Sequence, residues 1–84
     1  MKTPATHDID RLRRLVAEAE QHPPFQVFDA WRAAEEADIR EMSDGTFRIR
    51  VAGVKVQTTA GQVNAMLMWI GKVREIIEQA EAKA

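Results

Sequence analysis

Residues 47–58 carry the pattern that most constrains the fold, because apolar and polar side chains alternate there in two short runs. The apolar members are Phe47, Ile49, Val51, Val54 and Val56. A period of two is typical of a β-strand that buries one of its faces. With a two-residue loop at 52–53, the two runs predict a β-hairpin over Thr46–Thr58.

The short loop also predicts the register of the hairpin. It places Val51 opposite Val54, Ile49 opposite Val56, and Phe47 opposite Thr58, so that the apolar side chains share one face. The other face then carries Arg48, Arg50, Lys55 and Gln57. Gly53 supplies the positive φ that tight hairpin turns need, whereas Ala52 is less suited to the first turn position.

Two helices are expected before the hairpin. Apolar residues recur at helical spacing over Asp8–Gln21, and a break follows at His22 and Pro23. Pro24 suits the first position of a second helix, which we expect to extend over Pro24–Met42 because most of the stretch consists of strong helix formers. Gly45 is the expected stop signal.

A long amphipathic helix is expected after the hairpin. Thr59 with Gln62 three residues later is a capping-box pattern, which predicts a helix that starts near Ala60. Its predicted apolar stripe consists of Val63, Met66, Leu67, Ile70, Val73, Ile77 and Ala80, widened by Trp69 and Ile76.

These elements predict one α+β domain over residues 1–84, in the order α-α-β-β-α, with a central hairpin packed on the long C-terminal helix. Residues 1–7 are expected to form a flexible tail, and residues 81–84 a frayed end. A chain of 84 residues buries only a small hydrophobic core. Because it has no cysteine, no disulfide stabilises that core. A lone hairpin is also marginal in water. We therefore expect a homodimer, paired through the last helix or through the hairpin edges.

The charges are unevenly distributed along the chain. Residues 45–74 hold five bases and no acid, whereas residues 23–44 hold six acids and two bases. Arg48, Arg50 and Lys55 share the polar face of the predicted hairpin, where Arg50 lies opposite Lys55 as a like-charge pair. A negative partner would relieve that repulsion. Three such partners stay open: the acidic segment with Glu35, Glu36, Asp38 and Glu41, nucleic-acid phosphate, or an acidic protein surface.

The two tryptophans are further candidates for a binding surface. Aromatic side chains are enriched at the centres of protein interfaces, and Trp69 lies at the edge of the apolar arc of the last helix. The alternative is that Trp69 belongs to the core. Trp31 lies on the apolar face of the second helix, and we include both tryptophans among the binding residues to test.

The residue types in this chain do not favour catalysis. The chain has no cysteine and no tyrosine, and neither His7 nor His22 has a metal-ligand partner at helical spacing. The four glycines are dispersed and form no phosphate-binding loop. We expect no enzyme activity, no metal and no cofactor. The longest apolar run is far shorter than a membrane span, so we expect a cytoplasmic protein that does not bind membranes.

The sequence thus predicts a small, non-catalytic binding or regulatory module that acts by protein–protein interaction, for example as an inhibitor that occupies its partner. The residues predicted to bind are Arg48, Arg50, Lys55, Trp31 and Trp69. The alternative is a dimeric nucleic-acid-binding protein that uses the basic face of the hairpin. The net charge of −1 and the pI near 6.1 are unusual for that class.

Overall fold

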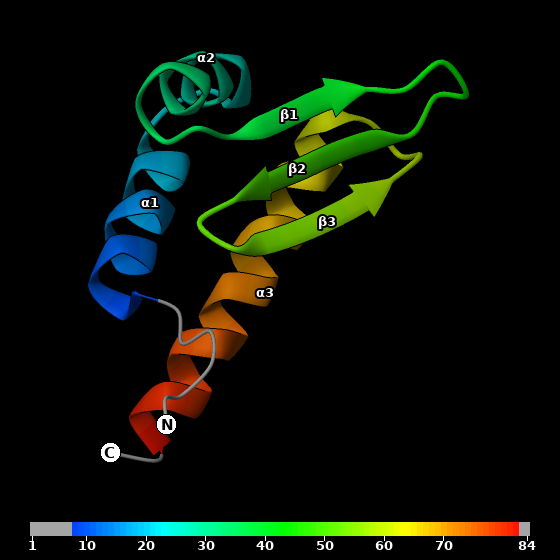
Figure 1. Ribbon diagram of the computed structural model, residues 1–84. Coiled ribbons are helices and arrows are strands. Elements are labelled where there is room, and N and C mark those ends of the chain that lie inside the picture. Colours follow the sequence, from blue (N-terminus) through cyan, green and yellow to red (C-terminus); the bar gives the residue numbers. More distant parts are fainter. Residues whose placement is uncertain (1–7, 83–84) are drawn as a thin grey trace, which may run out of the picture.

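The computed structural model describes residues 8–82, which form three helices and one antiparallel sheet (Figure 1). The elements in chain order are α1 (Ile9–Gln21), α2 (Pro24–Ala34), β1 (Asp38–Glu41), β2 (Phe47–Val51), β3 (Val54–Thr58) and α3 (Gln62–Ala82). The sheet has the strand order β1-β2-β3, and α3 runs behind it in Figure 1. The α+β class and the packing of the hairpin on the C-terminal helix are confirmed.

The first helix and the break after it agree with the prediction. The carboxylate of Asp8 caps α1 by accepting a hydrogen bond from the backbone N–H of Arg11 at 3.1 Å. His22 is extended, which ends the helix before the two prolines. Pro24 then occupies the first position of α2, where its missing N–H costs no helical hydrogen bond. The two helices therefore meet at a sharp corner.

The second helix is shorter than predicted, because it ends at Ala34 and not at Met42. The N–H of Glu35 still bonds to the Trp31 carbonyl at 2.8 Å, but Glu36 has a left-handed φ of +56°. A left-handed residue turns the chain out of the helix. The residues that follow form β1, which adds a third strand to the predicted hairpin.

Tertiary contacts explain why β1 is a strand despite the helix-forming residues around it. Ile39 lies opposite Ile49 in the β1–β2 register and is only 4% exposed. The Ile39 carbonyl accepts hydrogen bonds from Nε and Nη2 of Arg32 at 3.0 and 2.8 Å. Helix propensities differ by only a few tenths of a kcal/mol per residue, whereas burying an isoleucine contributes about 1.5–3 kcal/mol. Burial and pairing therefore outweigh propensity here.

The turn between β1 and β2 contains Gly45, which the sequence predicted as a helix stop. Gly45 has a φ of +90°, and the N–H of Met42 bonds to the Thr46 carbonyl at 2.7 Å. The carboxylate of Asp44 accepts the backbone N–H of Thr46 at 3.0 Å, and this hydrogen bond lowers the pKa of Asp44. Gly45 thus serves a strand-to-strand turn.

The hairpin of β2 and β3 has the predicted register. Val51 pairs with Val54, Ile49 with Val56, and Phe47 with Thr58. The two loop residues, Ala52 and Gly53, have φ values of +54° and +78°. Positive φ at both positions is the type I′ geometry that matches the twist of the flanking strands. The two-residue loop is therefore confirmed, even though alanine is an unusual residue at its first position.

The last helix starts later than predicted. It begins at Gln62, after Gly61 with a φ of +98°, and within residues 8–82 neither the Thr59 hydroxyl nor the Gln62 side chain accepts the backbone N–H of the other residue. The predicted capping box is therefore wrong. The hydroxyl of Thr58 accepts the N–H of Ala60 at 3.1 Å, which holds the turn instead.

The buried face of α3 is also narrower than the predicted stripe. It consists of Ala65, Met66, Trp69, Ile70 and Val73. Val63 and Leu67 are 56% and 60% exposed, because the sheet covers the face centred on Trp69 and leaves them outside. The helix continues to Ala82, so residues 81–82 are helical where fraying was predicted. The predicted tail at 1–7 and residues 83–84 lie outside the described residues.

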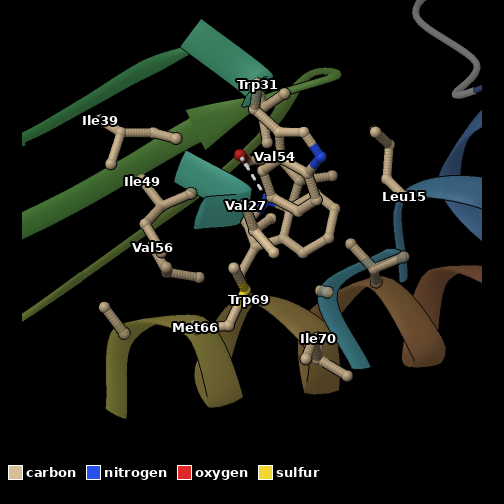
Figure 2. Close-up of a cluster of buried hydrophobic side chains, with 14 of the residues drawn as sticks. Leu15, Val27, Trp31, Ile39, Ile49, Val54, Val56, Met66, Trp69 and Ile70 are labelled. Carbon is tan, nitrogen blue, oxygen red and sulfur yellow. Dashed lines mark hydrogen bonds between the residues drawn. The ribbon is translucent and has the colours of Figure 1, made fainter. Parts of the chain in front are cut away.

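One hydrophobic core lies between the inner face of the sheet and the three helices. The rings of Trp31 and Trp69 are 4.9 Å apart, and those of Phe28 and Phe47 are 5.4 Å apart. Figure 2 shows Trp69 at the centre of this cluster, with its indole Nε1 donating to the Val54 carbonyl at 3.3 Å. The side chains that are buried are Leu12, Leu15, Val16, Ala19, Val27, Phe28, Trp31, Ile39, Phe47, Ile49, Val51, Val54, Val56, Ala65, Met66, Trp69, Ile70 and Val73.

Candidate binding face

The outer face of the sheet, opposite to the core, carries four cations. β1 contributes Arg40, β2 contributes Arg48 and Arg50, and β3 contributes Lys55; together we call these four residues the basic face. Asp38 and Gln57 are the other outward-facing strand residues. The strands alternate in and out with a period of two, so the apolar residues between these cations all point into the core. The outer face of the sheet thus carries one acid, Asp38, beside the four cations of the basic face.

Arg48 and Arg40 share that one acid. Nη2 of Arg48 lies 2.7 Å from Asp38 Oδ2, and Nε of Arg40 lies 2.9 Å from Asp38 Oδ1. The hydrogen bond from Arg40 is the main reason why the pKa of Asp38 is lowered, and the charge of Arg48 adds to it. The Arg48 side chain is only 22% exposed, so it is held against the sheet. Arg48 therefore has limited freedom to contact a partner.

Arg50 and Lys55 differ from Arg48 in their surroundings. They lie directly opposite each other in the β2–β3 register, and both are exposed. Neither side chain makes a hydrogen bond or an ion pair with any residue in the part of the chain that the structure describes. Like charges at directly opposite strand positions repel each other. These two cations are consequently the part of the basic face that is available to bind an anion.

Glu35, one acid of the segment before the hairpin, pairs with the first helix. Glu35 accepts from Nη2 of Arg11 at 2.8 Å and from Nη2 of Arg14 at 3.2 Å. Burial alone would raise the pKa of Glu35, but these hydrogen bonds outweigh it and lower the pKa.

Of the four acids considered as internal partners for the basic face, only Asp38 makes an ion pair with it among residues 8–82. Glu41 lies opposite Phe47 on the inner side of the register, and Glu36 is exposed at the end of α2. The acidic segment therefore supplies an ion-pair partner for Arg48, one of the three predicted cations, and for Arg40, whereas Arg50 lies opposite Asp38 without an ion pair and Lys55 has none.

Trp31 and Trp69, which were predicted to bind a partner, are both part of the core. They are 1% and 0% exposed, so neither presents a surface to another molecule. Each indole N–H also has an internal acceptor, Glu18 Oε1 at 3.0 Å for Trp31 and the Val54 carbonyl for Trp69. The alternative that Trp69 is a core residue is the one that the structure supports.

Arg40 is a member of the basic face that the sequence analysis missed. It was expected on a helix, because the predicted second helix extends to Met42. One signal was present, because Ser43, Asp44 and Gly45 form a turn-like cluster between Ile39 and the alternating run that starts at Phe47. Such a cluster between two apolar segments is typical of a hairpin with a longer loop.

A separate cleft of about 580 Å³ lies between α1 and α2. Arg14, Glu18 and Glu35 line it, and Arg14 pairs with both acids at 3.2 Å. A charged ligand would have to break these internal pairs before it bound. The cleft is therefore a weaker candidate site than the exposed pair of Arg50 and Lys55.

Comparison of the chain with models of protein families, with curated proteins and with solved structures found no match. Within residues 8–82, no three His, Asp or Glu side chains gather closely enough to hold a metal ion. No helix in the same part of the chain is both long and apolar enough to span a membrane.

Proposed function

We propose that this protein is a small, non-catalytic binding module that docks its basic face on an acidic surface of a partner protein. It would act by occupying a surface of that partner, as an inhibitor does. The observation that carries the proposal is the pair of Arg50 and Lys55, which face each other and are exposed, and whose side chains make no ion pair within the described residues, although Asp38 lies opposite Arg50 on β1. A carboxylate placed between them would turn a repulsive pair into an attractive triad.

A protein partner is favoured over nucleic acid by the composition of this face. No aromatic side chain lies among the outward-facing strand residues, whereas single-stranded nucleic acid is usually bound by stacking bases on aromatic rings. The net charge of −1 also opposes long-range attraction to a polyanion. Phosphate groups would nevertheless satisfy the same two cations, so the experiment includes a nucleic-acid arm.

Affinity capture with charge-matched variants tests the proposal. The variant Arg50→Gln/Lys55→Gln removes the available pair, and Arg13→Gln/Arg74→Gln removes two exposed cations that pair with Glu81 and Glu20 on the helices. We expect the wild type and the helix variant to retain the same protein from a lysate of the native cells, with or without nuclease. The sheet variant should retain at least tenfold less of it.

Two other results would contradict the proposal. Equal loss of the captured protein in both variants would show that only the overall charge matters. Loss of the captured material after nuclease treatment would assign the basic face to nucleic acid instead.

Two predictions from the sequence remain proposals about the same module. β1 supplies the third strand that the lone hairpin lacked, so the exposed apolar residues Val63 and Leu67 of α3 are now the main reason to expect a homodimer. A cytoplasmic location likewise stays a prediction.

A further inference from the structure

The two edges of the sheet are β1 and β3, and their outward backbone groups can be identified from the register. In an antiparallel pair, residues alternate between those that bond to the neighbouring strand and those that point away from it. The type I′ turn makes Val51 and Val54 a bonded pair, so the backbone N–H and C=O groups of Lys55 and Gln57 point away from β2. On β1 the same alternation points the backbone groups of Ile39 outward.

The β1 edge is closed by α2. The guanidinium of Arg32 donates two hydrogen bonds to the Ile39 carbonyl, at 3.0 and 2.8 Å, and a third to Asp29 at 3.1 Å. A guanidinium that is held in place by three hydrogen bonds blocks the strand edge from pairing with another strand. No further strand can pair with β1 unless Arg32 is displaced.

The β3 edge is covered only by one flexible side chain. Nζ of Lys72 donates to the Lys55 carbonyl at 3.0 Å, and this is the one hydrogen bond from α3 to the outward groups of β3 in the described residues. Beside this edge lies an open groove, with β3 as one wall and α3 as the other, lined by Lys55, Val56, Gln57, Met68, Gly71, Lys72 and Glu75. A Cβ atom built on Gly71 would meet no atom within 4 Å, so the groove is unobstructed at that point.

We propose that this groove binds an extended segment of the partner protein, which adds to β3 as a fourth strand. This inference rests on the proposed function, since it states how the acidic partner docks. The backbone of the segment would bond to the outward groups of Lys55 and Gln57, and its first N–H would replace the ammonium of Lys72 on the Lys55 carbonyl. Lys72, once released, remains beside the segment as a free cation.

Charge complementarity defines the sequence that fits. Side chains of an added strand alternate between the two faces of the sheet. One set would lie beside Lys55, with Arg50 one strand further in on β2, which favours acidic residues. The other set would lie toward α3, where Met68 and Gly71 favour apolar residues and Lys72 and Glu75 are the charged members of the wall. The occupant is therefore a segment with alternating acidic and apolar side chains. The β3 strand of a second copy fits poorly, because it would bring another Lys55 and Lys72 to the same groove.

A synthetic peptide tests this proposal with the full-length protein. The probe is a fluorescein-labelled eight-residue peptide of alternating glutamate and valine, and its control is the fully N-methylated analogue, which keeps the charge but cannot donate backbone hydrogen bonds. Gly71→Leu fills the groove from a position that touches no core residue, and Gly71→Ala is the matched control. We expect fluorescence anisotropy to show at least tenfold weaker binding for Gly71→Leu and for the N-methylated peptide, with Gly71→Ala within twofold of the wild type.

The backbone resonances provide an independent measurement. In a titration followed by NMR, the amide protons of Lys55 and Gln57 should shift and become protected from exchange, because they enter new hydrogen bonds. Equal binding of the peptide by the wild type and Gly71→Leu, or of both peptides by the wild type, would overturn strand addition and leave the basic face as a purely electrostatic docking site. Absence of peptide binding would overturn the inference as well, whereas the capture experiment decides the proposed function separately.

Discussion

Replacing Trp69 with alanine is expected to lower the free energy of unfolding by about 3–5 kcal/mol. Trp69 is fully buried against Trp31, with ring centroids 4.9 Å apart, and it donates a hydrogen bond to the Val54 carbonyl at 3.3 Å. The truncation therefore leaves a large cavity between α3 and the sheet and removes the N–H that reaches across it. In a domain of 84 residues that loss approaches the whole stability.

Urea unfolding followed by circular dichroism measures this effect. Met68→Ala is the matched control, because Met68 is the neighbouring residue on α3 and is 44% exposed. We expect the control to remain within about 0.5 kcal/mol of the wild type. A loss below about 1 kcal/mol for Trp69→Ala would contradict its central position in the core and reopen its prediction as a binding residue.

Replacing Ile39 with alanine is expected to lower the free energy of unfolding by about 2–4 kcal/mol. Ile39 is the one residue of β1 that is buried, and it packs opposite Ile49 beneath α2. Its loss weakens the attachment of β1 to the sheet and leaves β2 closer to an open edge.

The control for Ile39 is Glu41→Ala in the same strand. Glu41 is exposed and makes no ion pair within the described residues, so we expect a change within about 0.5 kcal/mol. Thermal unfolding of both variants is the measurement. Similar losses for the two variants would contradict the role of buried Ile39 as the residue that attaches β1 to the core.

The hairpin was predictable because its pattern is local. Alternation over residues 47–58 and a loop of two residues leave one register that buries every apolar side chain. The thirteen residues of the first helix were predictable for the same reason, since Asp8 caps a regular apolar stripe that ends at a proline pair.

The third strand was not predictable in this way, because its stability comes from distant contacts. Nothing near Ile39 in the sequence indicates that Arg32 covers its carbonyl or that Ile49 lies beside it. Local preference favours a helix there, and tertiary pairing reverses it. The consequence reaches the candidate site, since Arg40 joins the basic face only when this segment is a strand.

The charges of the candidate site were easier to predict than their partners. Arg50 and Lys55 follow from the hairpin register, whereas the pairing of Glu35 with Arg11 and Arg14 depends on how α1 meets the end of α2. That arrangement divides the basic face into Arg40 and Arg48, which share Asp38, and a pair of cations that remain available.

Site-specific photo-crosslinking tests the central claim, that the outer face of the sheet contacts a partner protein, most directly. Benzoylphenylalanine is placed at Gln57, beside the basic face, or at Ala17, which is exposed on α1, and the native cells are irradiated. The proposed function predicts a nuclease-resistant adduct with a single protein from position 57 and none from position 17. An adduct from position 17 alone, or one at position 57 that nuclease removes, would contradict it.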